Sequence, residues 1–513
     1  MQTTFAQSPI WQLERQYFEE VNLGAWQQNE VPHYITSNPY MAKTYAHMIM
    51  GMLRDSLGQH DTDEPLYVVE LGAGHGRFSF HVLRELSHQL ALLGIEQPPL
   101  VYVMTDFVEE MLKAWEENPR LQPFVEAGLL DFARFDITKD TALFLRKAHR
   151  AIMPGSMRRP LVVTANYLFD CVPQDLFYFD QGQAYQVLTT LKNYDPEATQ
   201  SAREQLKNID LEYAYEAIDG ARFDNPTVQK VFDKYKDTLQ DSHLLFPEAG
   251  MQGLERLKAL SPYGMLLLTA DKGSYMLQDW QQRPAPYLAS HGCFSLTVNF
   301  HALGQHCQAL QGEWLTPTLP PHHINVLALL YLRNPLHYTE VISNYDMQVA
   351  DFGPEGYYSI KKHIEKQIPD LAAKDLFAYL QLSHYDARLF SQFLPRLHQL
   401  AEHLNPRQSF ALLHIIAQVW DGYYPLGEAL DLAYHISTLL VGLGFAQEAM
   451  QFVGFSEELY GTNESNLFMR AFCHYALEQP TEAHEVLQKL LGQNPHHESA
   501  KQLMQELMAT QST

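Results

Sequence analysis

The sequence predicts an α/β domain with a mostly parallel sheet, followed by an all-α region. Between about residues 60 and 335, short apolar runs alternate with segments of helical periodicity, which is typical of a parallel sheet covered by helices on both faces. From residue 336 onward the strand-like runs disappear, and helical periodicity continues to the end. We therefore expect two domains, residues 1–335 and 336–513, with Pro335 and the stretch Asn344–Tyr358 marking the linker.

Six apolar runs are the expected strands of this sheet. A polar segment over about 190–260, rich in Gln and Asp, lies between the fourth and fifth runs, and we expect it to be a helical insertion. Because it would lie over the carboxyl edge of the sheet, where ligands bind in open α/β folds, it is either a substrate lid or a helical cap. The six runs are Leu66–Glu70, Leu100–Asp106, Leu130–Phe135, Leu161–Ala165, Met265–Ala270 and Ile324–Leu332.

The first run ends at Glu70 and leads into a turn with glycines at alternate positions, Gly72, Gly74 and Gly76. Glycine adopts positive φ at little cost and lets the backbone approach a ligand closely. A dinucleotide-binding loop has its third glycine one position later, where this chain has Arg77, and the Gly-Lys-Ser/Thr of a Walker loop is absent. The pattern acid-x-Gly-x-Gly-x-Gly resembles motif I of class I S-adenosylmethionine-dependent methyltransferases; an ordinary glycine-rich strand–helix turn is the alternative.

Acidic residues end the second and third runs. Asp106 closes the second run, where a carboxylate can accept hydrogen bonds from both hydroxyls of a cofactor ribose. It is also placed to cap a helix over Val108–Trp115, and the two roles are compatible. Asp136 follows the third run and is placed to accept from an adenine amino group, although Asp-Ile-Thr is also an ordinary turn sequence.

The fourth run and its loop, Thr164–Pro173, resemble a specific family. MidA-like proteins, the family of the mitochondrial complex I assembly methyltransferase, carry Ala-Asn-Glu-Phe-Phe-Asp-Ala-Leu-Pro here. Four further blocks resemble the family in the same order, over roughly residues 15 to 335: Tyr34–Ser37 with Thr36, Glu70–Gly76, Gly264–Gly273 with Asp271, and Thr297–Leu303. The matching positions of the fourth run are Ala165, Asn166, Phe169, Asp170 and Pro173.

Three positions depart from the family pattern. Tyr167 stands where the family has Glu, Asp106 where Glu is usual, and Lys272 where the family has Tyr. The helical C-terminal third is not part of the core family. The missing carboxylate at Tyr167 is the departure with the greatest bearing on activity.

The resemblance implies methyl transfer from S-adenosylmethionine to a protein arginine. Since a guanidinium is protonated at pH 7, carboxylates are needed to orient it and to take a proton. Asp170 is the first candidate for this role and Asp271 the second, while Asn166 could orient the acceptor; Asp170 could also be a helix cap. The cofactor-binding candidates are Thr36, Glu70, Gly72, Gly74, Gly76, Asp106, Asp136 and Asn166.

The helical C-terminal region shows a weak repeat. Ala449 and Ala483 lie in similar settings, 34 residues apart, and each precedes an amphipathic helix. This period resembles tetratricopeptide repeats, which bind protein partners, and an irregular helical bundle is the alternative.

Composition narrows the possible partners and location. The net charge of −24 argues against a nucleic-acid partner, because phosphate binding needs a basic surface, and it is compatible with basic peptide substrates. No apolar run reaches ~18 residues and no secretory signal is visible, so we expect no membrane partner and a cytoplasmic protein. The four cysteines are scattered and no metal-binding motif occurs, so no metal is expected.

Two other readings remain open. Asn166–Phe169 is similar to the Asn-x-x-aromatic motif of methyltransferases that act on bases, so a nucleic acid or a small molecule is an alternative acceptor. The charge argues against the nucleic acid. Alternatively, Tyr167 marks a catalytically inactive core that binds the cofactor as a scaffold, with the repeats carrying the function.

Overall fold

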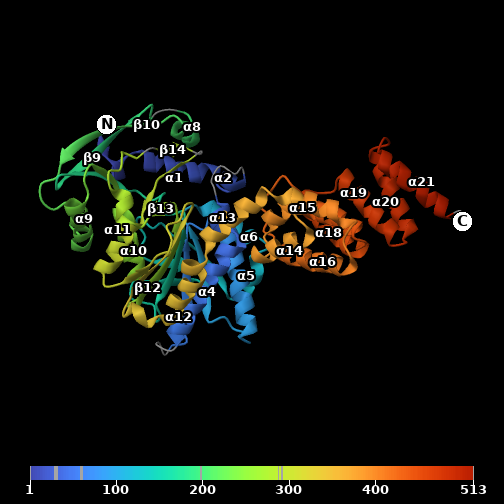
Figure 1. The fold of residues 1–513 in the computed structure, drawn as a ribbon, viewed down its shortest axis with the longest axis horizontal. Helices are drawn as coiled ribbons and strands as arrows, with labels where there is room; N and C mark the ends of the chain where they lie inside the picture. Colours follow the sequence, from blue (N-terminus) through green and yellow to red (C-terminus); the bar gives the residue numbers. More distant parts are fainter. Residues whose placement is uncertain are drawn as a thin grey trace. The chain divides into compact units, whose positions relative to one another are not determined.

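A computed structural model describes residues 2–27, 33–57, 62–196, 199–286, 288–290 and 293–511. The chain forms two compact units, Met1–Ser359 and Ile360–Thr513. The first contains the strands and the second is helical, so the predicted α/β domain followed by an all-α region is confirmed (Figure 1).

The first unit is built on a seven-stranded sheet in the order β17-β18-β12-β7-β2-β3-β4. Strands β4, β3, β2, β7 and β12 are parallel, whereas β18 runs antiparallel to β12 and to β17. All six expected strands are present, and β17 is an addition. The bounds are β2 Leu66–Leu71, β3 Leu100–Asp106, β4 Leu130–Arg134, β7 Leu161–Asn166, β12 Gly264–Asp271, β17 Glu313–Leu315 and β18 Asn325–Leu332.

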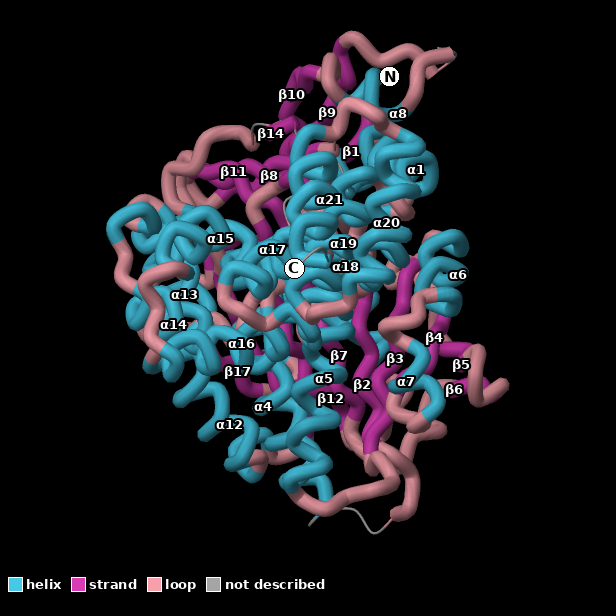
Figure 2. The backbone as a smooth tube through the Cα atoms, turned by 90° about the vertical axis from the view of Figure 1, so that its right-hand side faces the viewer, coloured by secondary structure: helices cyan, strands magenta, loops and turns pink. Residues whose placement is uncertain are grey.

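The strand order reverses at β2. Strands β3 and β4 lie on one side of it, and β7 and β12 lie on the other (Figure 2). In open α/β sheets, ligands bind at this reversal, outside the carboxyl ends of the strands. The fold therefore places the glycine turn after β2 at the expected binding edge.

Helices cover both faces of the sheet (Figure 1). On one face, α9 Pro226–Thr238, α10 Glu248–Lys258 and α11 Phe300–Ala309 share an apolar core with alternate residues of β2, β7 and β12. On the other face, α4 Pro39–Leu57 packs against α5 Arg77–Leu92 and α12 Thr339–Tyr345. Strands buried on both sides account for their near-continuous apolar sequence.

A second, antiparallel sheet occupies part of the segment that we expected to be a helical insertion. It has the order β1-β9-β8-β11, with β10 on β9. The segment 190–260 holds α8 Ala202–Leu206, α9 and α10, but also β10 and β11, so it is only partly helical. Strand β10 has the sequence Asp-Leu-Glu-Tyr-Ala-Tyr-Glu-Ala, in which apolar and polar residues alternate as is typical of a strand with one buried face. The polar composition of the whole segment made this alternation hard to recognise from the sequence. The bounds are β1 Thr3–Thr4, β8 Asp175–Asp180, β9 Gln183–Lys192, β10 Asp210–Ala217 and β11 Ser242–Phe246.

The first unit runs to Ser359, whereas the sequence places the domain boundary at residue 335. The segment in between carries α12, which packs on α4. The two carboxylate oxygens of Asp55, near the end of α4, accept hydrogen bonds from the backbone N–H groups of Glu340 (3.2 Å) and Val341 (3.1 Å). These bonds cap the N-terminus of α12.

The second unit is a succession of helices, beginning within α13 Pro354–Glu365. In Figure 1 they follow one another in orange to red. Neighbouring helices pack in sequence from α17 to α21, and Ala449 of α18 and Ala483 of α20 are fully buried. The other bounds are α14 Ala373–Leu382, α15 Ala387–Ala401, α16 Pro406–Asp421, α17 Leu432–Gly442, α18 Ala446–Tyr460, α19 Glu464–Ala476, α20 Pro480–Gln493 and α21 Glu498–Gln511.

Candidate functional site

Two cavities meet at the glycine turn. The first, of about 120 Å³, is lined by Glu70, Thr36, Asn166 and Asp170 among others, and we call it the Glu70 cavity. The second, of about 350 Å³, is lined by Asp106, Asp136 and residues of α1 Ile10–Val21, and we call it the Asp106 cavity. Both are lined by Phe18, Gly72, Gly74, Tyr167 and Cys171.

The glycine turn needs the backbone freedom that the sequence suggested. Gly72, Gly74 and Gly76 all have positive φ, at 61°, 52° and 80°. The turn is held from two sides, since Ala73 N–H donates to the Thr105 carbonyl (2.9 Å) and the Trp115 indole N–H to the Gly74 carbonyl (2.8 Å). The turn therefore presents a fixed backbone, without side chains at Gly72 and Gly74, to both cavities.

Glu70 lies at the base of the turn with its carboxylate buried. It accepts hydrogen bonds from the Ser79 hydroxyl of α5 and from the Tyr102 hydroxyl of β3, the latter at 2.8 Å. Burial raises the pKa of Glu70 to about 7, although both hydrogen bonds oppose this. Two neighbouring elements thus fix this carboxyl group at the wall of the Glu70 cavity.

Asp106 joins the glycine turn to the next helix. Its Oδ2 accepts from Gly74 N–H (3.4 Å), and its Oδ1 accepts from Val108 N–H (3.0 Å), just before α6 Glu109–Glu117. Burial raises its pKa to about 6. The capping role and the position on the cavity wall occur together, and each oxygen keeps a further lone pair for a ligand hydroxyl.

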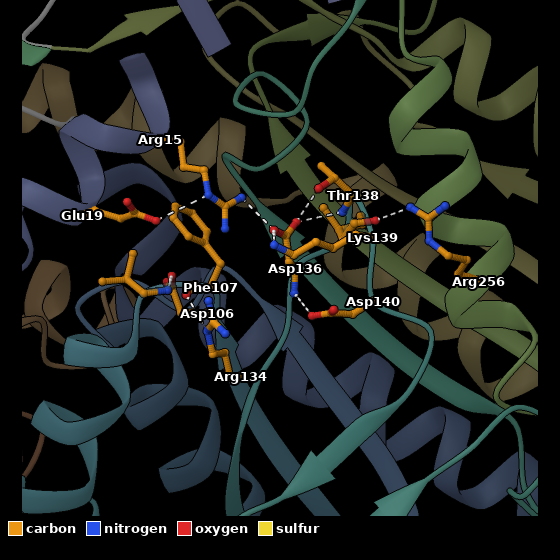
Figure 3. Close-up of polar contacts among 12 residues, drawn as sticks. Arg15, Glu19, Asp106, Phe107, Arg134, Asp136, Thr138, Lys139, Asp140 and Arg256 are labelled. Carbon is orange, nitrogen blue, oxygen red and sulfur yellow. Dashed lines mark hydrogen bonds and ion pairs between the residues drawn. The ribbon is translucent and has the colours of Figure 1, made fainter. Parts of the chain in front are cut away.

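Asp136 is already bound to other side chains (Figure 3). Its Oδ1 accepts from the Thr138 N–H (3.0 Å) and hydroxyl (2.6 Å), and its Oδ2 pairs with Arg15 Nη1 (2.7 Å) and Lys139 Nζ (3.2 Å). Burial raises the pKa of Asp136, but the Thr138 bonds and Arg15 outweigh it and leave the pKa below its usual value. An adenine amino group would have to share this carboxylate with Arg15.

Arg15 extends from α1 to the wall of the Asp106 cavity. Its guanidinium lies 4.1 Å from the ring centroid of Phe107, and its Nε is 3.4 Å from Glu19 Oε1 (Figure 3). It therefore links α1 to the loops that follow β3 and β4.

The end of β7 presents Asn166 and Tyr167. The Tyr45 hydroxyl donates to Asn166 Oδ1 (2.7 Å), and Asn166 Nδ2 is buried without a hydrogen-bond partner among the described residues. Tyr167 has φ of +49°, which is strained for a side chain of this size, and its ring lines both cavities.

Asp170 and Asp271 come together behind the Tyr167 loop. Burial raises the pKa of Asp170 to about 6, and burial together with the negative charge of Asp170 also raises the pKa of Asp271 well above its usual value. Asp170 lines the Glu70 cavity and accepts from the Cys171 thiol (3.3 Å). Asp271 accepts from Lys272 N–H (2.7 Å), is fully buried and lies outside the lining of both cavities.

Thr36 reaches the Glu70 cavity from α3 Tyr34–Ser37. Its hydroxyl donates to the His33 carbonyl (3.1 Å), and the His33 ring lies edge-on to that of His75 in the glycine turn, with centroids 4.8 Å apart. Helix α3 thus contributes to the lining of the Glu70 cavity, and the residue before it contacts the glycine turn.

Sequence reasoning missed the contribution of α1. Trp11, Gln12, Glu14, Arg15 and Phe18 line the Asp106 cavity from one face of this helix. Glu14 is only 2% exposed, and neither carboxylate oxygen has a hydrogen-bond partner among the described residues. The sequence signal that could have identified this site is the position of Glu14 among the apolar residues Trp11, Leu13 and Tyr17.

Two other kinds of site are absent from the part of the chain that the structure describes. No group of three or more His, Cys, Asp or Glu side chains could hold a metal ion there. Over the same residues, no helix is both long and apolar enough to cross a membrane.

Comparison with known proteins agrees with the site. Residues 44–292 match the model of a family described as "Putative S-adenosyl-L-methionine-dependent methyltransferase". This match covers Glu70, the glycine turn, Asp106, Asp136, Asp170 and Asp271, and it supports an S-adenosylmethionine-dependent methyltransferase family. The cofactor that it implies is S-adenosylmethionine. No curated protein matches the chain.

Solved structures show more distant likeness. A Burkholderia thailandensis protein bound to S-adenosyl-homocysteine is 14% identical, with 66% of this chain and 90% of that chain covered and a TM-score of 0.39. A native crystal structure from the same organism has the same identity and coverage, with a TM-score of 0.40. The plantazolicin methyltransferase BpumL, in complex with S-adenosyl-homocysteine and a plantazolicin analogue, is 13% identical over 64% of this chain and 99% of its own, with a TM-score of 0.23.

Proposed function

We propose that this chain is an S-adenosylmethionine-dependent methyltransferase that acts on a nitrogen of a protein side chain, with arginine suggested by the MidA-like resemblance. The observation that carries the proposal is the junction of the two cavities at the glycine turn, with Asp106 on one side and Asp170 on the other. A nucleoside at Asp106 and an acceptor at Asp170 would meet there.

The residues present fit this cofactor. Asp106 has lone pairs for ribose hydroxyls, and the absence of side chains at Gly72 and Gly74 leaves room for a ligand across the strand ends. On the other side of the turn, the unpartnered Asn166 Nδ2 is a donor for the cofactor carboxylate. The two cavities therefore offer polar groups of the kinds that the two halves of the cofactor require.

When bound, S-adenosylmethionine supplies a sulfonium methyl group, so that a nitrogen–carbon bond forms as the sulfur–carbon bond breaks and sulfur keeps the electron pair. The protein must align the acceptor and exclude water, which can lower the barrier by several kcal/mol. Asp170, with its raised pKa, is placed to take the proton that the acceptor nitrogen loses and to pass it to solvent. Asp271 would act through Asp170, since it does not line either cavity.

We also propose that the helical unit is a tetratricopeptide-like domain that binds a protein partner. Helices α18 and α20 begin at Ala446 and Pro480, which repeats the spacing of the buried Ala449 and Ala483. Both follow a short connection from α17 and α19, respectively. Stacked helix pairs of this kind form extended binding surfaces.

A catalytically inactive scaffold is the second candidate, and Tyr167 is the observation in its favour. The ring of Tyr167 lines both cavities at the position where the family carries a carboxylate. The remaining carboxyl groups, Asp170 and Glu14, argue for an active core. A small-molecule acceptor is compatible with the same site.

Incubation of the full chain with methyl-labelled S-adenosylmethionine and native cell extract tests the proposal. We expect label in a protein band, and no label when Asp170→Asn replaces the wild-type chain although that variant still binds S-adenosylhomocysteine. Binding without transfer by the wild-type chain would support the scaffold. Label only in small molecules would support the small-molecule acceptor.

A further inference from the structure

Glu14 is a buried carboxyl group that no cation neutralises among the described residues, and the group that favours its charge is the weak thiol donor of Cys171. It lies on the inward face of α1, is 2% exposed and lines the Asp106 cavity, and neither oxygen has a hydrogen-bond partner among the described residues. Burying a charge without a partner is costly, so such groups in folded proteins are normally paired or protonated. The groups around Glu14 should therefore show what compensates the cost of burying its carboxyl group.

The adjacent cation on the helix does not neutralise Glu14. Arg15 is bound to Asp136 and Glu19 and lies over Phe107 (Figure 3). Asp136 draws the guanidinium toward the loop after β4, with Nη1 and Oδ2 only 2.7 Å apart. The helix thus contributes one satisfied charge and one unsatisfied charge to the same cavity.

The group facing Glu14 is another acid. The negative charge of Asp170 adds to burial in raising the pKa of Glu14, and the Cys171 thiol interacts with both carboxyl groups. Cys171 lines both cavities, Glu14 lines the Asp106 cavity and Asp170 the Glu70 cavity. The two acids therefore lie on either side of the junction where the cofactor and acceptor would meet.

We propose that Glu14 and Asp170 together form the binding site for a positively charged nitrogen group of the methyl acceptor, with Glu14 as the residue that selects a cation over a neutral group. This inference rests on the proposed function and adds to it a recognition residue on α1. A guanidinium or ammonium group carries only donors, which matches two carboxylates that lack donors. One positive charge between Glu14 and Asp170 offsets the repulsion between the two carboxylates. It also gives the Glu14 carboxylate hydrogen-bond donors.

The site also accounts for the proton released in the reaction. As the nitrogen–methyl bond forms and the sulfur–methyl bond breaks, the nitrogen loses one proton and sulfur keeps the electron pair. A carboxylate of the pair takes this proton and releases it to water. The methyl group brings the positive charge of the sulfonium and one proton leaves, so the methylated nitrogen group keeps a single positive charge.

Small probes test this site in the full chain. The protein is first saturated with S-adenosylhomocysteine, and then methylguanidinium or its neutral analogue methylurea is titrated while binding is measured by calorimetry. We expect methylguanidinium to bind and methylurea to bind at least about tenfold more weakly, because a charged hydrogen-bond pair is lost. Glu14→Gln should weaken methylguanidinium binding by about tenfold or more and leave methylurea unchanged. Glu19→Gln is the matched control on the same helix, because it removes an acid that is 49% exposed and outside the cavity lining.

Thermal unfolding of the ligand-free chain separates recognition from a structural role. Glu14→Gln, or Glu14→Met if the amide does not fold, should raise Tm, since it removes an unpartnered buried acid. Unchanged methylguanidinium binding by the variant, or equal binding of both probes by the wild type, would overturn the inference. So would a lower Tm with weaker S-adenosylhomocysteine binding, which would show that Glu14 only supports the fold.

If the wild type binds S-adenosylhomocysteine but not methylguanidinium, this inference fails and the proposed function stands. If the wild type does not bind S-adenosylhomocysteine, both fail.

Discussion

Two parts of the cavity lining differ in how their buried acidic side chains are paired. We call the ends of β2, β3 and β4 with the loops that follow them the floor, and helix α1 the roof. On the floor, Glu70 accepts hydrogen bonds from Ser79 and Tyr102, and Asp106 accepts from the backbone N–H groups of Gly74 and Val108. On the roof, α1 carries Glu14 without a partner and Arg15 paired with an acid of the floor, Asp136. The floor is therefore organised before any ligand arrives, whereas the roof is incomplete without one.

This difference suggests a division of work. A preorganised floor suits the cofactor, which is the same in every reaction cycle, because no reorganisation is needed on binding. An unsatisfied charge on the roof suits recognition of an acceptor, because its pairing energy is gained only when the right group enters. Substitutions on the floor should then act mainly on cofactor affinity, and substitutions on the roof should have smaller effects on it.

Gly74→Val should have the largest effect and abolish binding of S-adenosylhomocysteine in calorimetry. The new side chain would enter the junction of the cavities, and a β-branched residue at φ of +52° costs about 1–3 kcal/mol in addition. Gly94→Val is the matched control, since Gly94 has φ of +68° and open space around its missing Cβ. Equal losses of affinity in both variants would mean that backbone strain, not the cavity, is responsible. Unchanged affinity in Gly74→Val would contradict our placement of the ligand.

Glu70→Gln should change how stability depends on pH. The folded chain holds the Glu70 proton up to about pH 7, and the unfolded chain releases it near 4.5. Between these values the folded state binds more protons, so this group makes stability fall as pH rises, by roughly 3 kcal/mol in total. Gln keeps an acceptor for Ser79 and Tyr102 but does not titrate. Chemical denaturation at a series of pH values should therefore give a flatter profile for the variant than for the wild type; parallel profiles would place the titration elsewhere.

Asp106→Ala should weaken S-adenosylhomocysteine binding by about 1–3 kcal/mol, the value of charge-assisted bonds to ribose hydroxyls. Asp106→Asn separates the two roles of this residue, because the amide oxygen can still accept from Val108 N–H while the charge is lost. We expect Asn to restore most of the stability lost in Ala but only part of the affinity. Calorimetry and thermal unfolding of both variants measure these effects. Full affinity in Ala would leave Asp106 as a helix cap alone.

The residues of the floor were largely predicted from the sequence, whereas those of the roof were not. Glu70, the glycine turn, Asp106 and Asp170 lie at or just after the carboxyl ends of strands of one parallel sheet, and parallel strands bring these ends to one edge. Their meeting therefore follows from strand order alone. Glu14 and Arg15 belong to a helix that comes some fifty residues before β2, the first strand of the parallel sheet, and no local pattern states where such a helix packs. The engagement of Asp136 by Arg15 was missed for the same reason. The second sheet was missed because the polar alternation of β10 resembles a loop or an exposed helix.

Arg15→Met should have the smallest effect and tests the roof directly. The Arg15 side chain is 31% exposed, and Asp136 keeps its bonds to Thr138 and Lys139 when the guanidinium is removed, so we expect a loss of stability of no more than about 1 kcal/mol. The methionine stem retains apolar contact with Phe107. Hydrogen exchange should increase in α1 and remain unchanged in β2 and β3, because Arg15 ties the helix to the loops and not the strands to each other. Lys139→Met is the control for the same carboxylate, since Lys139 is 62% exposed and belongs to the floor. Faster exchange throughout the sheet in Arg15→Met would show that roof and floor form one cooperative unit, and the distinction between them would then be wrong.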